Sequence, residues 1–72
     1  MNGIKEMKFS IFLINCIAEK VEKKPSEVYE ILDQTQVLDE YIIPCYDVLH
    51  TLGREYLVED ICELVKERGG TI

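Results

Sequence analysis

The side chains best suited to chemistry in this sequence lie between Cys45 and Arg54. The segment holds a thiol, a phenol, a carboxylate, the only imidazole of the chain and a guanidinium. On a continuous helix, Tyr46 and Asp47 would lie four and three residues before His50, where a carboxylate can orient an imidazole for general-base chemistry. One interpretation of this stretch is therefore a small enzyme that uses His50 and Asp47.

A cysteine nucleophile activated by the histidine is not favoured. At a separation of five residues, Cys45 and His50 would point about 140° apart on a helix of 3.6 residues per turn. Neither an oxyanion-hole turn nor a glycine-rich phosphate loop accompanies them. The other role for His50 is structural, as an imidazole near a helix C-terminus that bonds to a backbone carbonyl or to Asp47. We therefore expect no catalytic residue, and a protein that is not an enzyme.

The three cysteines do not form a recognisable metal or disulfide pattern. Cys16, Cys45 and Cys62 are an odd number and include no CxxC pair. A zinc site needs about four ligands at characteristic spacings, which these cysteines and His50 would supply only by tertiary coincidence. We expect reduced cysteines packed as small buried apolar residues in a cytoplasmic protein, with no metal and no cofactor.

The net charge of −6 is distributed unevenly along the chain. Residues 1–24 carry a balance of +2, residues 25–65 carry ten acidic groups against Arg54 alone, and residues 66–72 add +1. A surface of this sign repels phosphate backbones, so direct nucleic-acid binding is disfavoured. The acidic block suits solubility or the steering of a basic protein partner.

The first strong helical pattern covers residues 4–23. Its apolar positions recur at spacings of three and four and are widened by further apolar residues, so we expect the most buried helix of the fold. The run is too short to cross a bilayer, which takes about 20 apolar residues, and we expect no membrane association. The spacing could also form the seam of a homodimer through this helix. The stripe comprises Ile4, Met7, Ile11, Ile14, Ala18 and Val21.

Three further helices are predicted. Pro25 suits the first position of a helix that runs to Gln34. A third helix begins near Val37 to Asp39 and contains Pro44, which would lose the bond to the Glu40 carbonyl at a cost of about 3 kcal/mol, so we predict a kink or break there. Its core stripe is Leu38, Tyr41, Ile42, Cys45, Leu49 and Leu52, and Gly53 is expected to end it in a left-handed conformation.

The fourth helix is predicted from Arg54 to Arg68, with Gly69 and Gly70 as its stop. The short glycine turn before it has the shape of a helix-turn-helix connection. However, this helix presents carboxylates where a recognition helix would present Arg, Lys, Asn or Gln, which argues against DNA reading. We predict an all-α fold: a single domain over residues 1–72, built as a small compact bundle of four helices with the third kinked or broken at Pro44.

The stretch YDVLHTLGREYLVEDI, residues 46–61, resembles a bacterial family designated domain of unknown function 3791. The resemblance rests on the Tyr-Asp-Val-Leu-His-Thr motif and on a preceding helix matched here by VYEIL at residues 28–32, and it covers most of the chain. It implies a compact helical domain with no established activity. It also implies a toxin–antitoxin or regulatory pairing, since members are often encoded beside a predicted ADP-ribosyltransferase-like protein. The sequence departs from the family pattern at Pro44 and at Leu52, where a polar residue is common.

We interpret the sequence as a non-enzymatic, antitoxin-like or regulatory protein-interaction module whose partner is a protein with a basic surface. Tyrosine and arginine are frequent interface anchors, and carboxylates complement a basic partner. Two alternatives stay open, a nucleic-acid-mimicking inhibitor of a DNA-binding protein and a small enzyme using His50 and Asp47. The residues expected to contact the partner are Tyr46, Asp47, His50, Arg54, Tyr56, Glu59 and Glu63.

Overall fold

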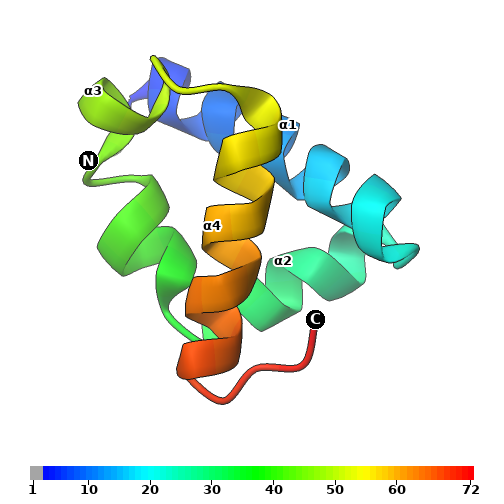
Figure 1. Cartoon of the computed structure of the whole chain (residues 1–72). Coiled ribbons are helices and arrows are strands. Elements are labelled where there is room, and N and C mark those ends of the chain that lie inside the picture. Colours follow the sequence, from blue (N-terminus) through cyan, green and yellow to red (C-terminus); the bar gives the residue numbers. More distant parts are fainter. Residues whose placement is uncertain (1–2) are drawn as a thin grey trace.

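Five helical segments follow one another in the computed structural model, which describes residues 3–72 (Figure 1). They are α1 (Ile4–Val21), α2 (Pro25–Gln34), the π-helix η1 (Leu38–Ile42), α3 (Tyr46–Leu49) and α4 (Arg54–Glu67). The described residues form no strand, so the predicted all-α fold is confirmed. None of their helices is long and apolar enough to cross a membrane.

The predicted third helix is broken at Pro44, and this break accounts for five segments instead of four. The Ile43 amide donates to the Leu38 carbonyl five residues back at 3.0 Å, which is the wide turn of a π-helix. An α-turn at this point would set the Pro44 ring against the Glu40 carbonyl. After a short turn the chain re-enters a helix at Tyr46.

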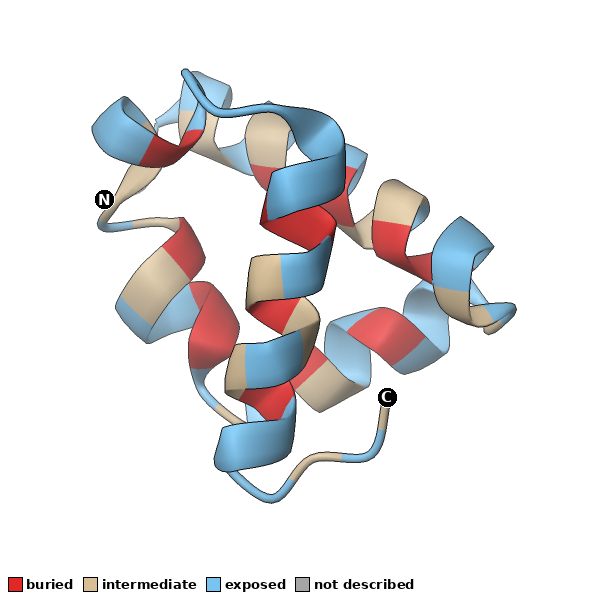
Figure 2. Cartoon of the chain, viewed as in Figure 1, coloured by how far each residue is buried: buried red, intermediate tan, exposed pale blue. Residues whose placement is uncertain are grey.

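The core lies where α1, α2, η1 and α4 meet. Both α2 and α4 pack against α1, and η1 packs against α1 and α2. Figure 2 shows the buried residues on the sides of the helices that face this centre, while the side of α4 nearest the viewer is exposed or half-buried. The buried apolar residues are Leu13, Ile17, Ala18, Val28, Leu32, Val37, Leu38, Ile42, Leu49, Leu57, Val58, Ile61 and Val65.

Helix α1 is not the most buried helix of the fold, contrary to what its apolar pattern predicts. Ile4, Met7, Ile11 and Phe12 are 73%, 58%, 54% and 46% exposed, whereas Ala18 is only 4% exposed. The apolar stripe is covered in the second half of the helix and uncovered in the first. The prediction that this is the most buried helix of the fold is therefore wrong, since α4 buries as many residues over a shorter length.

The helix ends also differ in part from the predictions. Helix α1 stops at Val21 instead of residue 23, because Glu22 takes a left-handed conformation with φ 56°. Gly53 is not a left-handed terminator: with φ −68° and ψ 146° it is the extended residue that precedes α4. Leu52 lies beside it and is exposed, not part of the core. Gly69, with φ 85°, ends α4 as predicted.

Candidate functional site

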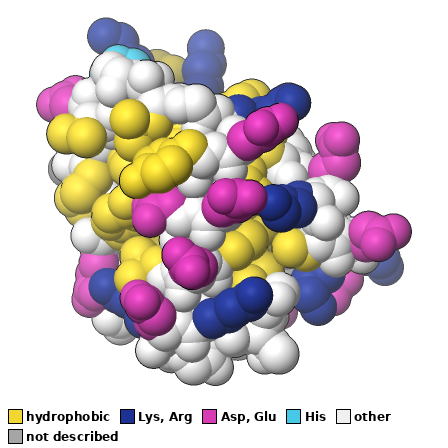
Figure 3. Space-filling model, in the orientation of Figure 1, with side chains coloured by type: hydrophobic (Ala, Val, Ile, Leu, Met, Phe, Trp, Pro, Cys, Tyr) yellow, Lys and Arg dark blue, Asp and Glu magenta, His cyan; other side chains and the backbone are white. Residues whose placement is uncertain are grey.

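The outward side of α4 carries three of the residues expected to bind a partner. Tyr56, Glu59 and Glu63 follow one another at spacings of three and four, which places them on one helical face, and all three are exposed. The opposite side of α4 holds the buried residues Leu57, Val58, Ile61 and Val65, so this orientation is determined by core packing. In Figure 3, Asp and Glu side chains spread over the front of the molecule, where α4 lies. Hydrophobic side chains gather beside them, over η1 and α3.

A groove of about 290 Å³ runs between η1 and α4, next to this face. Its one guanidinium, Arg68, already donates to Glu40 Oε1 at 2.8 Å and to the Thr35 carbonyl at 3.0 Å. The other described ion pair at α4 joins Lys20 to Glu59 at 3.7 Å. The carboxylates of Glu63 and Glu67 take part in neither pair, so the groove retains negative charge. Its lining residues are Glu40, Tyr41, Asp60, Glu63, Leu64, Glu67 and Arg68.

A hydrogen bond between Tyr41 and Asp60 forms one wall of the groove. The Tyr41 hydroxyl of η1 donates to Asp60 Oδ2 of α4 at 2.6 Å, and both side chains are half-buried. The bond to the carboxylate, together with partial burial, raises the pKa of Tyr41 to about 12. The phenol therefore stays protonated, and the Asp60 carboxylate is held in place beside the groove.

The residues from α3 form a separate aromatic cluster. The Phe9 ring of α1 meets Tyr46 edge to face, with centroids 5.4 Å apart. On its other side Tyr46 stacks on His50, with centroids 4.5 Å apart and planes 7° apart. This cluster joins the exposed N-terminal half of α1 to α3.

The His50 ring is held by a backbone carbonyl. This is one of the two structural roles predicted for it, the other being a bond to Asp47. His50 Nδ1 lies 2.7 Å from the Tyr46 carbonyl oxygen. A carbonyl oxygen can only accept, so this nitrogen is the donor, and the Asp47 carboxylate is not its partner. His50 and Asp47 are both exposed. An Asp47–His50 pair joined through Nδ1 is therefore not formed.

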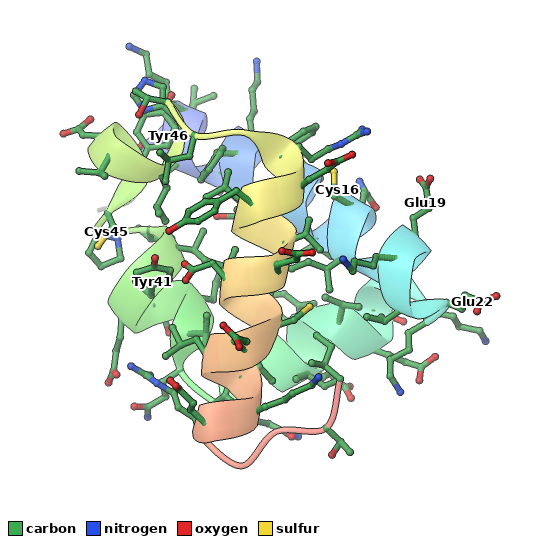
Figure 4. The ribbon with its side chains drawn as sticks, viewed as in Figure 1. Cys16, Glu19, Glu22, Tyr41, Cys45 and Tyr46 are labelled. Atoms are coloured by element: carbon green, nitrogen blue, oxygen red, sulfur yellow. The ribbon has the colours of Figure 1, made fainter. Side chains whose placement is uncertain are left out.

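Arg54 lies apart from both groups, in a depression of about 210 Å³ between α1 and the start of α4. Cys16 and Lys20 of α1 also line it. In Figure 4, Cys16 lies beside the N-terminal end of α4, whereas Tyr46 and Cys45 lie to the left of that helix, on its opposite side. The seven residues predicted to bind a partner thus form two groups, one on α3 and one on α4, with Arg54 on the other flank of α4.

The cysteines are free, as expected, but half-buried instead of fully buried. Burial raises the pKa of the Cys62 thiol, against the opposite effect of Lys20 and Lys66, which does not favour a nucleophilic thiolate. Within residues 3–72, no group of three or more His, Cys, Asp or Glu side chains is arranged to hold a metal ion.

Tyr41 and Asp60 are site residues that the sequence did not identify. Tyr41 was predicted as part of a core stripe, and Asp60 as one carboxylate among several. Their contact joins residues 19 positions apart, and no local pattern signals it. Only the tertiary fold, which brings η1 close to the middle of α4, places them together.

The comparisons with known proteins identify one family. The model of a family described as "Protein of unknown function (DUF3791)" matches residues 8–68, which include the motif segment 46–61 and the VYEIL helix. No curated protein and no solved structure matches the chain.

Proposed function

We propose a function from the surfaces of this chain, which belongs to the DUF3791 family of proteins of unknown function. The chain is a non-enzymatic module that binds a basic surface of a partner protein through the outward face of α4 and the adjoining groove. The observation that supports this proposal is the excess of carboxylates in the groove, where the one guanidinium is already paired.

The groove suits the side chain of an arginine or lysine. Carboxylates such as Glu63 and Glu67 can pair with a guanidinium through two parallel hydrogen bonds. The ring of Tyr41 lines the same space, and cations are attracted to the faces of aromatic rings. Tyr56, exposed at 59%, would add apolar contact area at the edge of the interface. The same acidic surface repels the phosphates of nucleic acid, so we infer that the arginine or lysine in the groove belongs to a protein partner.

The biological role that we propose is regulatory. A small acidic module that covers a basic site prevents that site from reaching its own ligand. This is how an antitoxin-like partner would act, and it agrees with the pairing that the family resemblance implies. The steering of a basic partner by the acidic surface would raise the association rate at low salt.

Nuclear magnetic resonance can test the proposal with a short arginine-containing peptide as the probe. We expect amide shifts to change at Tyr41, Tyr56 and Glu63, and the changes to shrink as salt is raised. The Glu59→Lys/Glu63→Lys variant should lose most of the response. A matched change on α2, Glu30→Lys/Asp33→Lys, alters the net charge equally at exposed positions and should retain it. Equal shifts on α2 and α4, or an unchanged response of the α4 variant, would argue against the proposal.

A further inference from the structure

A second exposed face runs along the whole of α1, on the side opposite the core. Its residues lie at alternating spacings of three and four along α1 and its C-cap residue Glu22, which places them on one side of the helix. All of them are exposed, including those in the second half of α1, where the apolar stripe is covered. We call these residues the α1 seam: Lys5, Lys8, Phe12, Asn15, Glu19 and Glu22.

The charges of the α1 seam oppose the dipole of their own helix. Lys5 and Lys8 are at the N-terminal end, which carries partial positive charge, and Glu19 and Glu22 are at the C-terminal end, which carries partial negative charge. On the other faces of α1 the usual order holds, with Glu6 in the first turn and Lys20 in the last.

The other long helices follow the usual order only in part. Helix α4 has Glu55 in its first turn and Lys66 in its last, whereas α2 has Glu27 in its first turn but Asp33 and no base in its last. The α1 seam carries the inverted order at both of its ends, which destabilises the isolated helix.

We propose that the α1 seam binds a second copy of this chain, with the two α1 helices antiparallel. One two-fold axis between positions 12 and 15 places Lys5 opposite Glu22 of the second copy, and Lys8 opposite Glu19. The same axis places Phe12 opposite Asn15. Each lysine then lies near the negative end of the other helix and each glutamate near the positive end, so the pairing reverses the unfavourable order.

The centre of the proposed pairing holds one aromatic and one polar position, Phe12 and Asn15. Phe12 and the neighbouring Ile11, which are 46% and 54% exposed, would be covered by the residues around Asn15 of the second copy. Asn15 in the seam would favour a single register, as a polar residue does in paired helices. In Figure 4, Glu19 and Glu22 extend away from the body of the molecule, and Glu19 also lines the depression beside Arg54.

The pairing is expected to be weak. Helix α1 has 18 residues and is about 27 Å long, so a contact confined to it lies at the small end of specific interfaces. We expect dissociation constants of about 1 to 100 μM, a range in which the concentration of the protein determines its state. The pairing does not use the α4 face, so it holds whether or not that face binds a basic partner.

Analytical ultracentrifugation with two charge variants tests the proposal. Lys5→Glu/Lys8→Glu makes the α1 seam entirely acidic, and Glu19→Lys/Glu22→Lys makes it entirely basic. Each variant alone should dissociate at least about tenfold more readily than the unaltered chain, which corresponds to about 1.4 kcal/mol. An equimolar mixture of the two should form a one-to-one dimer, because every charged position of the seam then meets an opposite charge. Circular dichroism would verify that both variants keep their helices.

The control is Glu30→Lys/Asp33→Lys, which has the same charge change as the basic variant but lies on α2, and it should dimerise like the unaltered chain. A monomer at a concentration of about 1 mM would overturn the proposal, since that lies above the expected range of dissociation constants. The same conclusion would follow if the mixed variants stayed monomeric, or if either variant alone dimerised as well as the unaltered chain.

Discussion

Replacement of Tyr41 by phenylalanine removes one hydroxyl and, with it, a hydrogen bond that joins η1 to the middle of α4. That hydroxyl donates to Asp60 Oδ2 at 2.6 Å. Hydrogen bonds to charged groups contribute about 1.5 to 3 kcal/mol to stability. Both side chains are half-buried, so solvent weakens the interaction, and we expect a loss of about 1 to 1.5 kcal/mol. In a domain of this size each 1 kcal/mol lowers Tm by roughly 4 to 8 °C.

Urea unfolding followed by circular dichroism would measure this loss. Tyr29→Phe is the matched control, because Tyr29 is 48% exposed on α2 and its hydroxyl makes none of the described hydrogen bonds. The control should change stability by less than about 0.5 kcal/mol. A double-mutant cycle with Asp60→Ala isolates the pair, and we expect a coupling of about 1 kcal/mol. A coupling near zero, with both tyrosine variants equally stable, would refute the assignment of this bond as the link between η1 and α4.

Three further outcomes follow from individual residues. The raised pKa of Tyr41 contributes stability that is complete below pH 10 and is lost as pH rises towards about 12. Asp60→Asn should bring the pKa of Tyr41, followed by absorbance, closer to 10, and should narrow the pH range over which this stability is lost. Glu22→Gly should stabilise the protein to urea by about 0.5 to 1 kcal/mol, because glycine adopts the left-handed conformation of this position without strain. Glu19→Gly, a control inside the helix, should destabilise the protein by about the same amount. Leu13→Ala, at a fully buried position, should lower the free energy of unfolding by about 2 to 5 kcal/mol, measured by thermal unfolding.

The elements with clear local signals could be predicted from the sequence. Helix α2 has the predicted bounds, because Pro25 suits a first helical position and Gln34 precedes a polar break. The start of α4 at Arg54 and its stop before Gly69 also agree with the prediction. The break at Pro44 was predictable because proline removes a specific backbone bond, although its π-helical form was not.

The features that depend on tertiary packing could not be predicted. The apolar stripe of α1 continues beyond the part of the helix that the core covers, so sequence periodicity alone could not show that Ile4, Met7 and Ile11 are exposed. Left-handed conformations occur at Glu22 and Gln36, where no glycine marks them, whereas Gly53 has an ordinary extended conformation.

The candidate site also combines features that local sequence predicts with features that depend on tertiary packing. The periodicity of α4 correctly predicted that Glu59 and Glu63 face outward, since both lie within one regular helix. The grouping of Arg54 with His50 assumed that the chain between them keeps both on one edge. In the structure that chain is a turn, and Arg54 lines the depression beside Cys16 instead.

Affinity capture from the cells of origin tests most directly the proposal that the α4 face binds a basic protein. Three tagged forms would be compared by quantitative mass spectrometry: the unaltered chain, Glu59→Lys/Glu63→Lys, and the α2 control Glu30→Lys/Asp33→Lys. We predict that one basic protein is retained by the unaltered chain and by the control, is lost from the α4 variant, and is released by high salt. Equal retention by all three forms would contradict the proposal, as would retention of no protein by the unaltered chain.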